Sequence, residues 1–196
     1  MSPSKVFIFN THDLPRRASE MREFDLDVPA PERMGIDVIA VPADQAIHIA
    51  MKLESVTEGV LVSAHVSTIA AGECIRCLDP VEVAIMRYFQ ELYRYAPEKA
   101  HTKAQRKAAE VFNDMEDDDD LVMDGELINL EGPVRDAIVL GLPINPICAP
   151  ECLGLCPGCG IKWNMLAPDH RHNLTDPRWA GLSDLLEEEN PDPISD

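Results

Sequence analysis

Six cysteines in three close pairs constrain this chain more than any other feature of its sequence. The pairs are Cys74-x-x-Cys77, Cys148-x-x-x-Cys152 and Cys156-x-x-Cys159. The apolar stretch Val6 to Phe9 is too short for an export signal, which predicts a cytoplasmic protein in a reducing compartment. Close cysteine pairs in that setting bind metal more often than they form disulfides, and zinc accepts thiolates tetrahedrally. The sequence therefore predicts structural zinc held by these six residues.

Six thiols exceed the four ligands of one tetrahedral ion, so either four of them form one site or two ions share the set. Closure through Cys74 and Cys77 would tie an early part of the chain to a late one, whereas closure between Cys148 and Cys159 would be local. The spacing leaves both arrangements open. The glycines of Cys156-Pro157-Gly158-Cys159-Gly160 allow backbone amides to turn toward the sulfurs, which is expected to lower the thiol pKa.

Two further features lie close to the last cysteines. Asp169, His170 and His172 form a polar cluster, and such a cluster near four thiols is more typical of a solvated loop than of metal ligands. Trp163 and Trp179 are expected to be buried and to anchor the cysteine-rich segment.

Hydrophobic patterning predicts an α+β fold, an antiparallel β-sheet meander with one packed amphipathic helix and a C-terminal Cys-rich zinc-binding segment. Alternation of apolar and polar residues predicts strands, separated by Pro and Gly turn signals. Val134, Ile138 and Leu142 recur every four residues, which predicts a helix over 131–142 that stops before Pro143. The predicted strands are Val6–Phe9, Phe24–Val28, Ile36–Val41, Ile47–Leu53, Val60–Ala70, Glu82–Tyr95 and Glu126–Leu130.

Composition predicts one α+β domain over residues 21–180, preceded by an N-terminal arm at 1–20. Within it, residues 98–120 end in the run Glu116 to Asp120 and are expected to form an acidic mobile insertion, because like charges repel. Residues 148–164 are the predicted zinc-binding segment. Residues 181–196 are expected to form an acidic C-terminal tail.

The charge balance argues against several classes of partner. The 196 residues carry a formal net charge of −18, and Lys103, Arg106 and Lys107 are the only basic cluster, so direct binding of naked RNA is disfavoured. No apolar run is long enough to span a membrane.

The sequence also lacks the recognisable nucleotide-binding, hydrolase and metalloprotease motifs, and four thiolates leave no coordination position open for catalysis. The chain is therefore expected not to be an enzyme.

Several linked motifs resemble the YceD family, also called the large ribosomal RNA subunit accumulation proteins. They are Cys74-Ile75-Arg76-Cys77-Leu78, the run from Ile128 through Arg135 to Pro143, and the run from Cys148 through Glu151 to Gly160. The closing Asp176-Pro177-Arg178-Trp179 is similar to the actinobacterial branch. The resemblance implies a bacterial cytoplasmic protein needed for synthesis, processing or stability of 23S rRNA. It implies no catalytic residues.

Two functional hypotheses follow. The first is a non-enzymatic ribosome-biogenesis factor whose zinc stiffens a docking surface for ribosomal proteins or large-subunit precursor particles. The second is a cytosolic thiol redox or metal-handling protein that uses the surplus cysteines.

Overall fold

The computed structural model describes residues 5–15, 17–96, 121–172 and 178. The chain divides into two compact units, Met1–Cys148 and Ala149–Asp196. The predicted insertion at 98–120 and the predicted tail at 181–196 lie outside the described residues.

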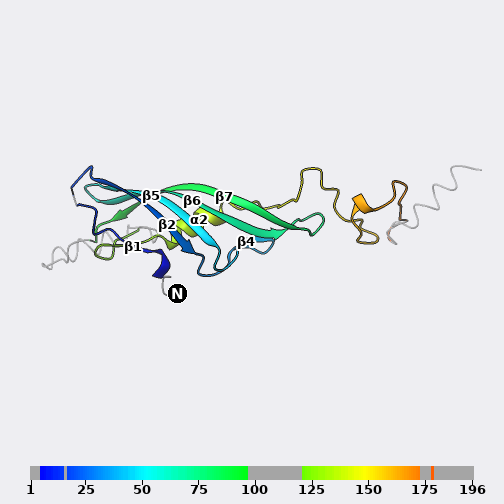
Figure 1. The fold of residues 1–196 in the computed structure, drawn as a ribbon, viewed down its shortest axis with the longest axis horizontal. Helices are drawn as coiled ribbons and strands as arrows, with labels where there is room; N and C mark the ends of the chain where they lie inside the picture. The colour runs from blue at the N-terminus through cyan, green and yellow to red at the C-terminus, as the bar shows by residue number, and fades with distance from the viewer. Residues whose placement is uncertain (1–4, 16, 97–120, 173–177, 179–196) are drawn as a thin grey trace, which may run out of the picture. The chain divides into compact units, whose positions relative to one another are not determined.

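Two antiparallel sheets form the framework of the first unit (Figure 1). The larger has six strands in the order β2-β5-β6-β4-β3, and β7 pairs with β6 along its other edge; the smaller pairs β1 with β8. The fold is α+β, as the patterning predicts. The strands are β1 (Ile8–Asn10), β2 (Met21–Pro29), β3 (Met34–Ile36), β4 (Ile39–Val41), β5 (Ala46–Ser55), β6 (Gly59–Glu73), β7 (Pro80–Arg94) and β8 (Leu127–Asn129).

The meander prediction holds for β5, β6 and β7, which follow one another as antiparallel neighbours. It is wrong for β2, which pairs with β5 rather than with the next strand in sequence. The predicted strand Ile36–Val41 is two strands, because the chain turns at Asp37 and Val38. The arm at Val6–Phe9 is also mixed, with a 3₁₀ turn η1 (Lys5–Phe7) leading into β1.

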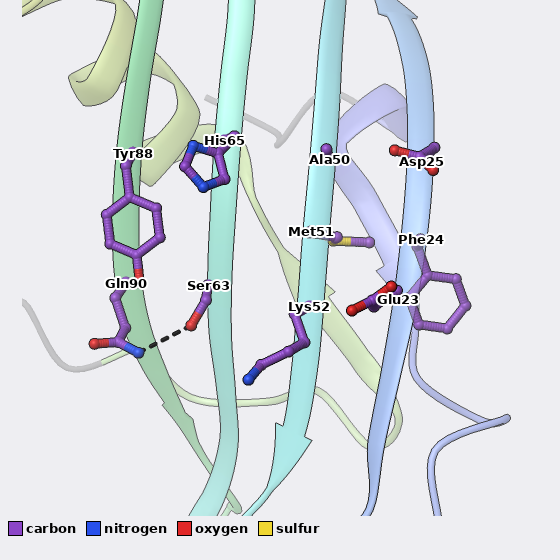
Figure 2. A pocket seen from close by; sticks show the side chains of 10 residues that line it. All are labelled: Glu23, Phe24, Asp25, Ala50, Met51, Lys52, Ser63, His65, Tyr88 and Gln90. Atoms are coloured by element: carbon purple, nitrogen blue, oxygen red, sulfur yellow. Dashed lines mark hydrogen bonds between the residues drawn. The ribbon is translucent and has the colours of Figure 1, made fainter.

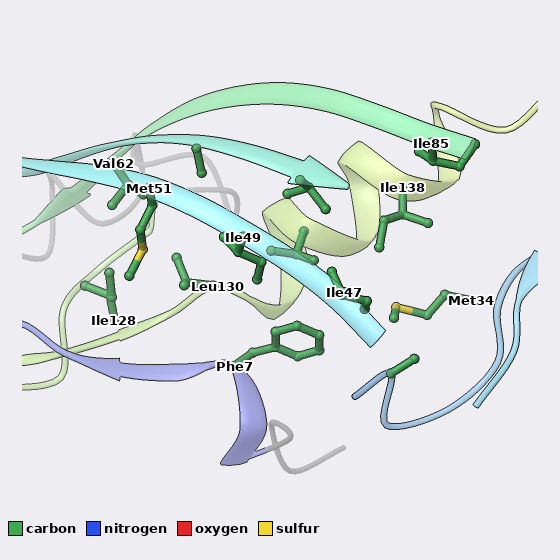
Figure 3. Close-up of a cluster of buried hydrophobic side chains, with 14 of the residues drawn as sticks. Phe7, Met34, Ile47, Ile49, Met51, Val62, Ile85, Ile128, Leu130 and Ile138 are labelled. Atoms are coloured by element: carbon green, nitrogen blue, oxygen red, sulfur yellow. The ribbon is translucent and has the colours of Figure 1, made fainter. Parts of the chain in front are cut away.

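One face of the larger sheet carries the hydrophobic core (Figure 3). Alternate residues of β5 are buried, including Ile47, Ile49 and Leu53, because successive side chains of a strand point to opposite faces. Phe7 of η1 and Ile128 of β8, in the smaller sheet, pack into the same cluster. The core thus joins the two sheets.

Helix α2 (Glu131–Val139) covers part of this buried face and contacts β7, β3 and β6. Val134 and Ile138 are buried, as their spacing predicts. The side chain of Asn129 accepts a hydrogen bond from the Glu131 N–H at 3.0 Å and so satisfies one of the first helical donors. The helix is three residues shorter than predicted because the chain tightens after Val139, where Gly141 N–H donates to Ile138 O.

The opposite face of the larger sheet is open and polar (Figure 2). Glu23, Asp25 and Asp27 alternate along β2 and are exposed. Tyr88 and His65 lie across β7 and β6 with ring centroids 5.0 Å apart. A shallow pocket runs between the acidic strand and these rings.

The described part of the second unit holds little regular structure. It contains one isolated antiparallel bridge, Leu155 with Lys162, and a 3₁₀ turn η2 (Trp163–Met165). Within the residues that the structure describes, no helix combines the length and the apolar character needed to cross a membrane.

Candidate metal sites

Cys74 and Cys77 occupy the turn between β6 and β7, at the end of the sheet, between the two strands predicted at 60–70 and 82–95. The Cys74 N–H donates to Asp79 O at 2.7 Å, and the Leu78 N–H donates to Cys74 O at 2.9 Å. Leu78 has a φ of 61°, in the left-handed region. These two hydrogen bonds fold the turn into a compact knuckle, Cys74–Asp79, that presents both thiols.

Cys148 joins this knuckle from the segment that follows α2. The Ile75 N–H donates to Pro146 O at 3.0 Å, which holds that segment against the turn. The sulfurs of Cys77 and Cys148 are 3.5 Å apart, and none of the six cysteines forms a disulfide. Two sulfurs on one tetrahedral zinc ion stand about 3.8 Å apart when Zn–S is about 2.3 Å. The observed separation is therefore close to that of shared ligation.

Within the first unit, the sulfurs of Cys74, Cys77 and Cys148 make up the first group of candidate ligand atoms, all within 4.8 Å of one another. Cys74 and Cys77 are buried, Cys148 is exposed and Cys152 is half-buried. The knuckle Cys74–Asp79 and Cys148 thus lie together, which is the proximity that closure through Cys74 and Cys77 requires.

The electrostatics of Cys74 favour a thiolate. Burial raises the pKa of its thiol, but hydrogen bonds to the sulfur lower the pKa by more than burial raises it. The resulting pKa is about 6, below the ordinary value of 9.0. The donors are the backbone groups of Cys148, Arg76 and Cys77 and the side chain of Cys77. Hydrogen bonds to the charged form stabilise it, and the thiolate is the form that binds metal.

The second group of ligand atoms starts from a knuckle of the same construction, Cys156–Ile161. The Cys156 N–H donates to Ile161 O at 2.8 Å, and the Gly160 N–H donates to Cys156 O at 2.8 Å. Gly160 has a φ of 70° and occupies the position equivalent to Leu78. Burial raises the pKa of the Cys156 thiol, but backbone hydrogen bonds from Cys159 and Gly158 bring it below its usual value. The predicted turning of amides toward this sulfur is confirmed.

Two histidines complete the second group with Cys156 and Cys159. The Nε2 atom of His170 lies 3.5 Å from the sulfur of Cys156 and 3.6 Å from that of Cys159. The sequence favours a solvated loop for His170 and His172; in the structure both lie in an irregular segment, His170 half-buried and His172 exposed, beside the two cysteines. The spacing of these histidines gives no signal of metal binding in the sequence. They are separated by one residue, whereas familiar zinc-finger patterns separate the histidines by about three to five.

The two knuckles allow a paired test of backbone strain. Leu78→Gly should stabilise the first unit by up to about 1 kcal/mol, since a non-glycine residue in the left-handed region costs about 1–2 kcal/mol and glycine adds roughly 0.5–1 kcal/mol of unfolded-state entropy. Gly160→Ala should destabilise the second unit by about 1–2 kcal/mol, although a Cβ there meets nothing within 4 Å. Urea unfolding of the metal-loaded variants measures both. Equal changes of the same sign in the free energy of unfolding would contradict a left-handed backbone at Leu78 and Gly160.

The fold and the two groups define the class of protein. It is an antiparallel-sheet protein with two Cys-rich groups that could hold metal. The family described as "Large ribosomal RNA subunit accumulation protein YceD" matches residues 62–186, which include both groups. This chain belongs to the YceD family.

Relatives of the chain include three uncharacterized proteins. An uncharacterized protein of Mycobacterium tuberculosis (strain ATCC 25618 / H37Rv) is 39% identical over 173 residues, covering 88% of this chain and 78% of the relative. One of Mycobacterium leprae (strain TN) is 33% identical over 184 residues, covering 94% and 79%. The uncharacterized protein YlbN of Bacillus subtilis (strain 168) is 30% identical over 79 residues, covering 40% and 46%. No solved structure matches.

Proposed function

We propose that this protein is a non-enzymatic, cytoplasmic ribosome-biogenesis factor that acts in the synthesis, processing or stability of 23S rRNA. The observation that carries the proposal is membership of the YceD family, whose description names large ribosomal RNA subunit accumulation. The proposed partners are ribosomal proteins or large-subunit precursor particles. Naked RNA is a poor partner for a chain of net charge −18 because phosphates require basic surfaces.

The open face of the sheet is the proposed docking surface for a basic partner. Glu23, Asp25 and Asp27 place three carboxylates along the edge strand β2. Next to them, the pocket offers the aromatic ring of Tyr88 and the imidazole of His65. Acidic residues beside an aromatic anchor suit a lysine- and arginine-rich protein, because the charges steer association and the ring supplies contact area.

The first group is proposed to hold zinc through four thiolates. Cys74, Cys77 and Cys148 supply three sulfurs. Cys152 follows Cys148 in the sequence at a spacing that suits the fourth ligand. Zinc is the preferred ion for such a set because soft thiolates in tetrahedral geometry select it. Bound there, it would fasten the β6–β7 turn to the segment after α2 and keep the end of the sheet rigid.

Charge reversal tests the docking surface. Asp25→Lys should weaken low-salt co-purification of ribosomal proteins and precursor particles, since it inverts one of the three carboxylates. Asp136→Lys is the matched control, because Asp136 is exposed on α2, which covers the other face of the sheet. Raising the salt should release the partners, because exposed charges are screened beyond about 8 Å at physiological ionic strength. Failure of any ribosomal protein to co-purify at low salt would refute the proposal.

The lowered pKa of Cys74 favours a second candidate, a thiol redox or metal-handling protein. That function requires a thiol that reacts while metal stays bound. Mild alkylation followed by mass spectrometry separates the two, because a structural site predicts slow modification that tracks zinc loss. Rapid modification of one cysteine in the zinc-loaded protein would favour the redox function.

A further inference from the structure

We propose that Cys156, Cys159, His170 and His172 bind a zinc ion of their own, and that this ion stabilises the fold of the second unit. The proposal is independent of the ribosomal role. It assigns the surplus cysteines to a mixed thiolate and imidazole site rather than to redox chemistry. It also divides the six cysteines into four and two.

The distances from His170 to the two cysteine sulfurs match those expected around a zinc ion. A tetrahedral ion with Zn–S near 2.3 Å and Zn–N near 2.0–2.1 Å separates sulfur from nitrogen by about 3.5–3.6 Å. The Nε2 atom of His170 lies 3.5 Å and 3.6 Å from the two sulfurs. All four ligand atoms of the group fall within 4.8 Å of one another. Two thiolates and two imidazoles form a closed set that is typical of structural zinc.

Gly158 makes room for the fourth ligand. A Cβ at this position would stand 2.5 Å from ring atoms of His172, and real Cβ contacts are never that close. The absence of a side chain in the knuckle is therefore what allows the His172 ring to approach Cys156. The ring of His172 also packs edge-on against His170, with centroids 4.5 Å apart.

The described residues of the second unit bury few side chains. Across 149–172, Cys156 is the only buried side chain. Trp163, predicted to be buried, is 37% exposed, and its ring is in a T-shaped arrangement with that of His170; Trp179 is outside the described residues. Modules this small rarely fold on a hydrophobic core alone, and a structural metal commonly supplies the missing free energy.

Zinc counting on the full chain tests the site directly. The wild-type protein, purified without added metal, should hold about two zinc ions per chain, as two closed four-ligand groups require. His170→Asn should hold one fewer, and Cys74→Ser should still hold the ion of the second group. A wild-type protein with one zinc per chain, or a His170→Asn variant with an unchanged zinc count, would overturn the proposal.

A glycine pair tests the geometry without removing a ligand. Gly158→Ala should increase the rate of zinc transfer from this group to a chelator by about tenfold or more, the usual effect of disturbing a group that positions a ligand. It should also speed tryptic cleavage after Lys162, which lies between the cysteines and the histidines. Gly132→Ala is the control, because a Cβ there meets nothing within 4 Å. Equal rates in the two variants would show that His172 is not a ligand.

Discussion

Cys74→Ser is expected to lower the free energy of unfolding of the first unit by on the order of 5 kcal/mol, a fraction of the ~10–16 kcal/mol that zinc binding supplies in small zinc modules. Cys74 is fully buried, and its sulfur accepts the hydrogen bonds that stabilise a thiolate. Serine keeps the volume but binds zinc far less well, so the link between the β6–β7 turn and Cys148 would be lost.

Urea unfolding followed by circular dichroism, together with a zinc count, measures this effect. Ile75→Ser is the matched control, because Ile75 lies in the same knuckle with its side chain 44% exposed. Its hydrogen bond to Pro146 is made by the backbone N–H and survives the substitution. Superimposable unfolding curves for wild type and Cys74→Ser would mean that no metal is held there.

Ile138→Ala is expected to destabilise the first unit by about 2–5 kcal/mol, because it removes buried methyl groups and leaves a cavity. Ile138 is fully buried on α2, against the apolar face of the sheet. The zinc count should not change under native conditions, since the substitution touches neither group of ligands. The result would separate loss of core packing from loss of metal.

The control for this substitution is Leu140→Ala at the end of the same helix. Leu140 is 82% exposed, and surface substitutions usually change stability by no more than about 0.5 kcal/mol. Urea midpoints at constant slope provide the comparison. A similar loss in both variants would show that α2 does not pack against the sheet as described.

Local patterning was sufficient for most of the elements. The alternation in β5 and β6 and the four-residue repeat in α2 each report which side chains face the core, and that information is contained in a few neighbouring residues. Local patterning failed where pairing was non-local, as for β2 with β5. It also failed at the turn that separates β3 from β4, where alternation continues across the break.

The sequence by itself determined the two knuckles, because Cys-x-x-Cys spacing and the residues around it encode a local turn with its own hydrogen bonds. Only the tertiary structure decided which candidate ligands lie close together. It brings Cys148 to Cys74 and Cys77 through the packing of the segment after α2, and it brings His170 and His172 to Cys156 and Cys159. The physical reason is that a metal site requires four atoms within a few ångströms, and sequence separation does not specify that distance.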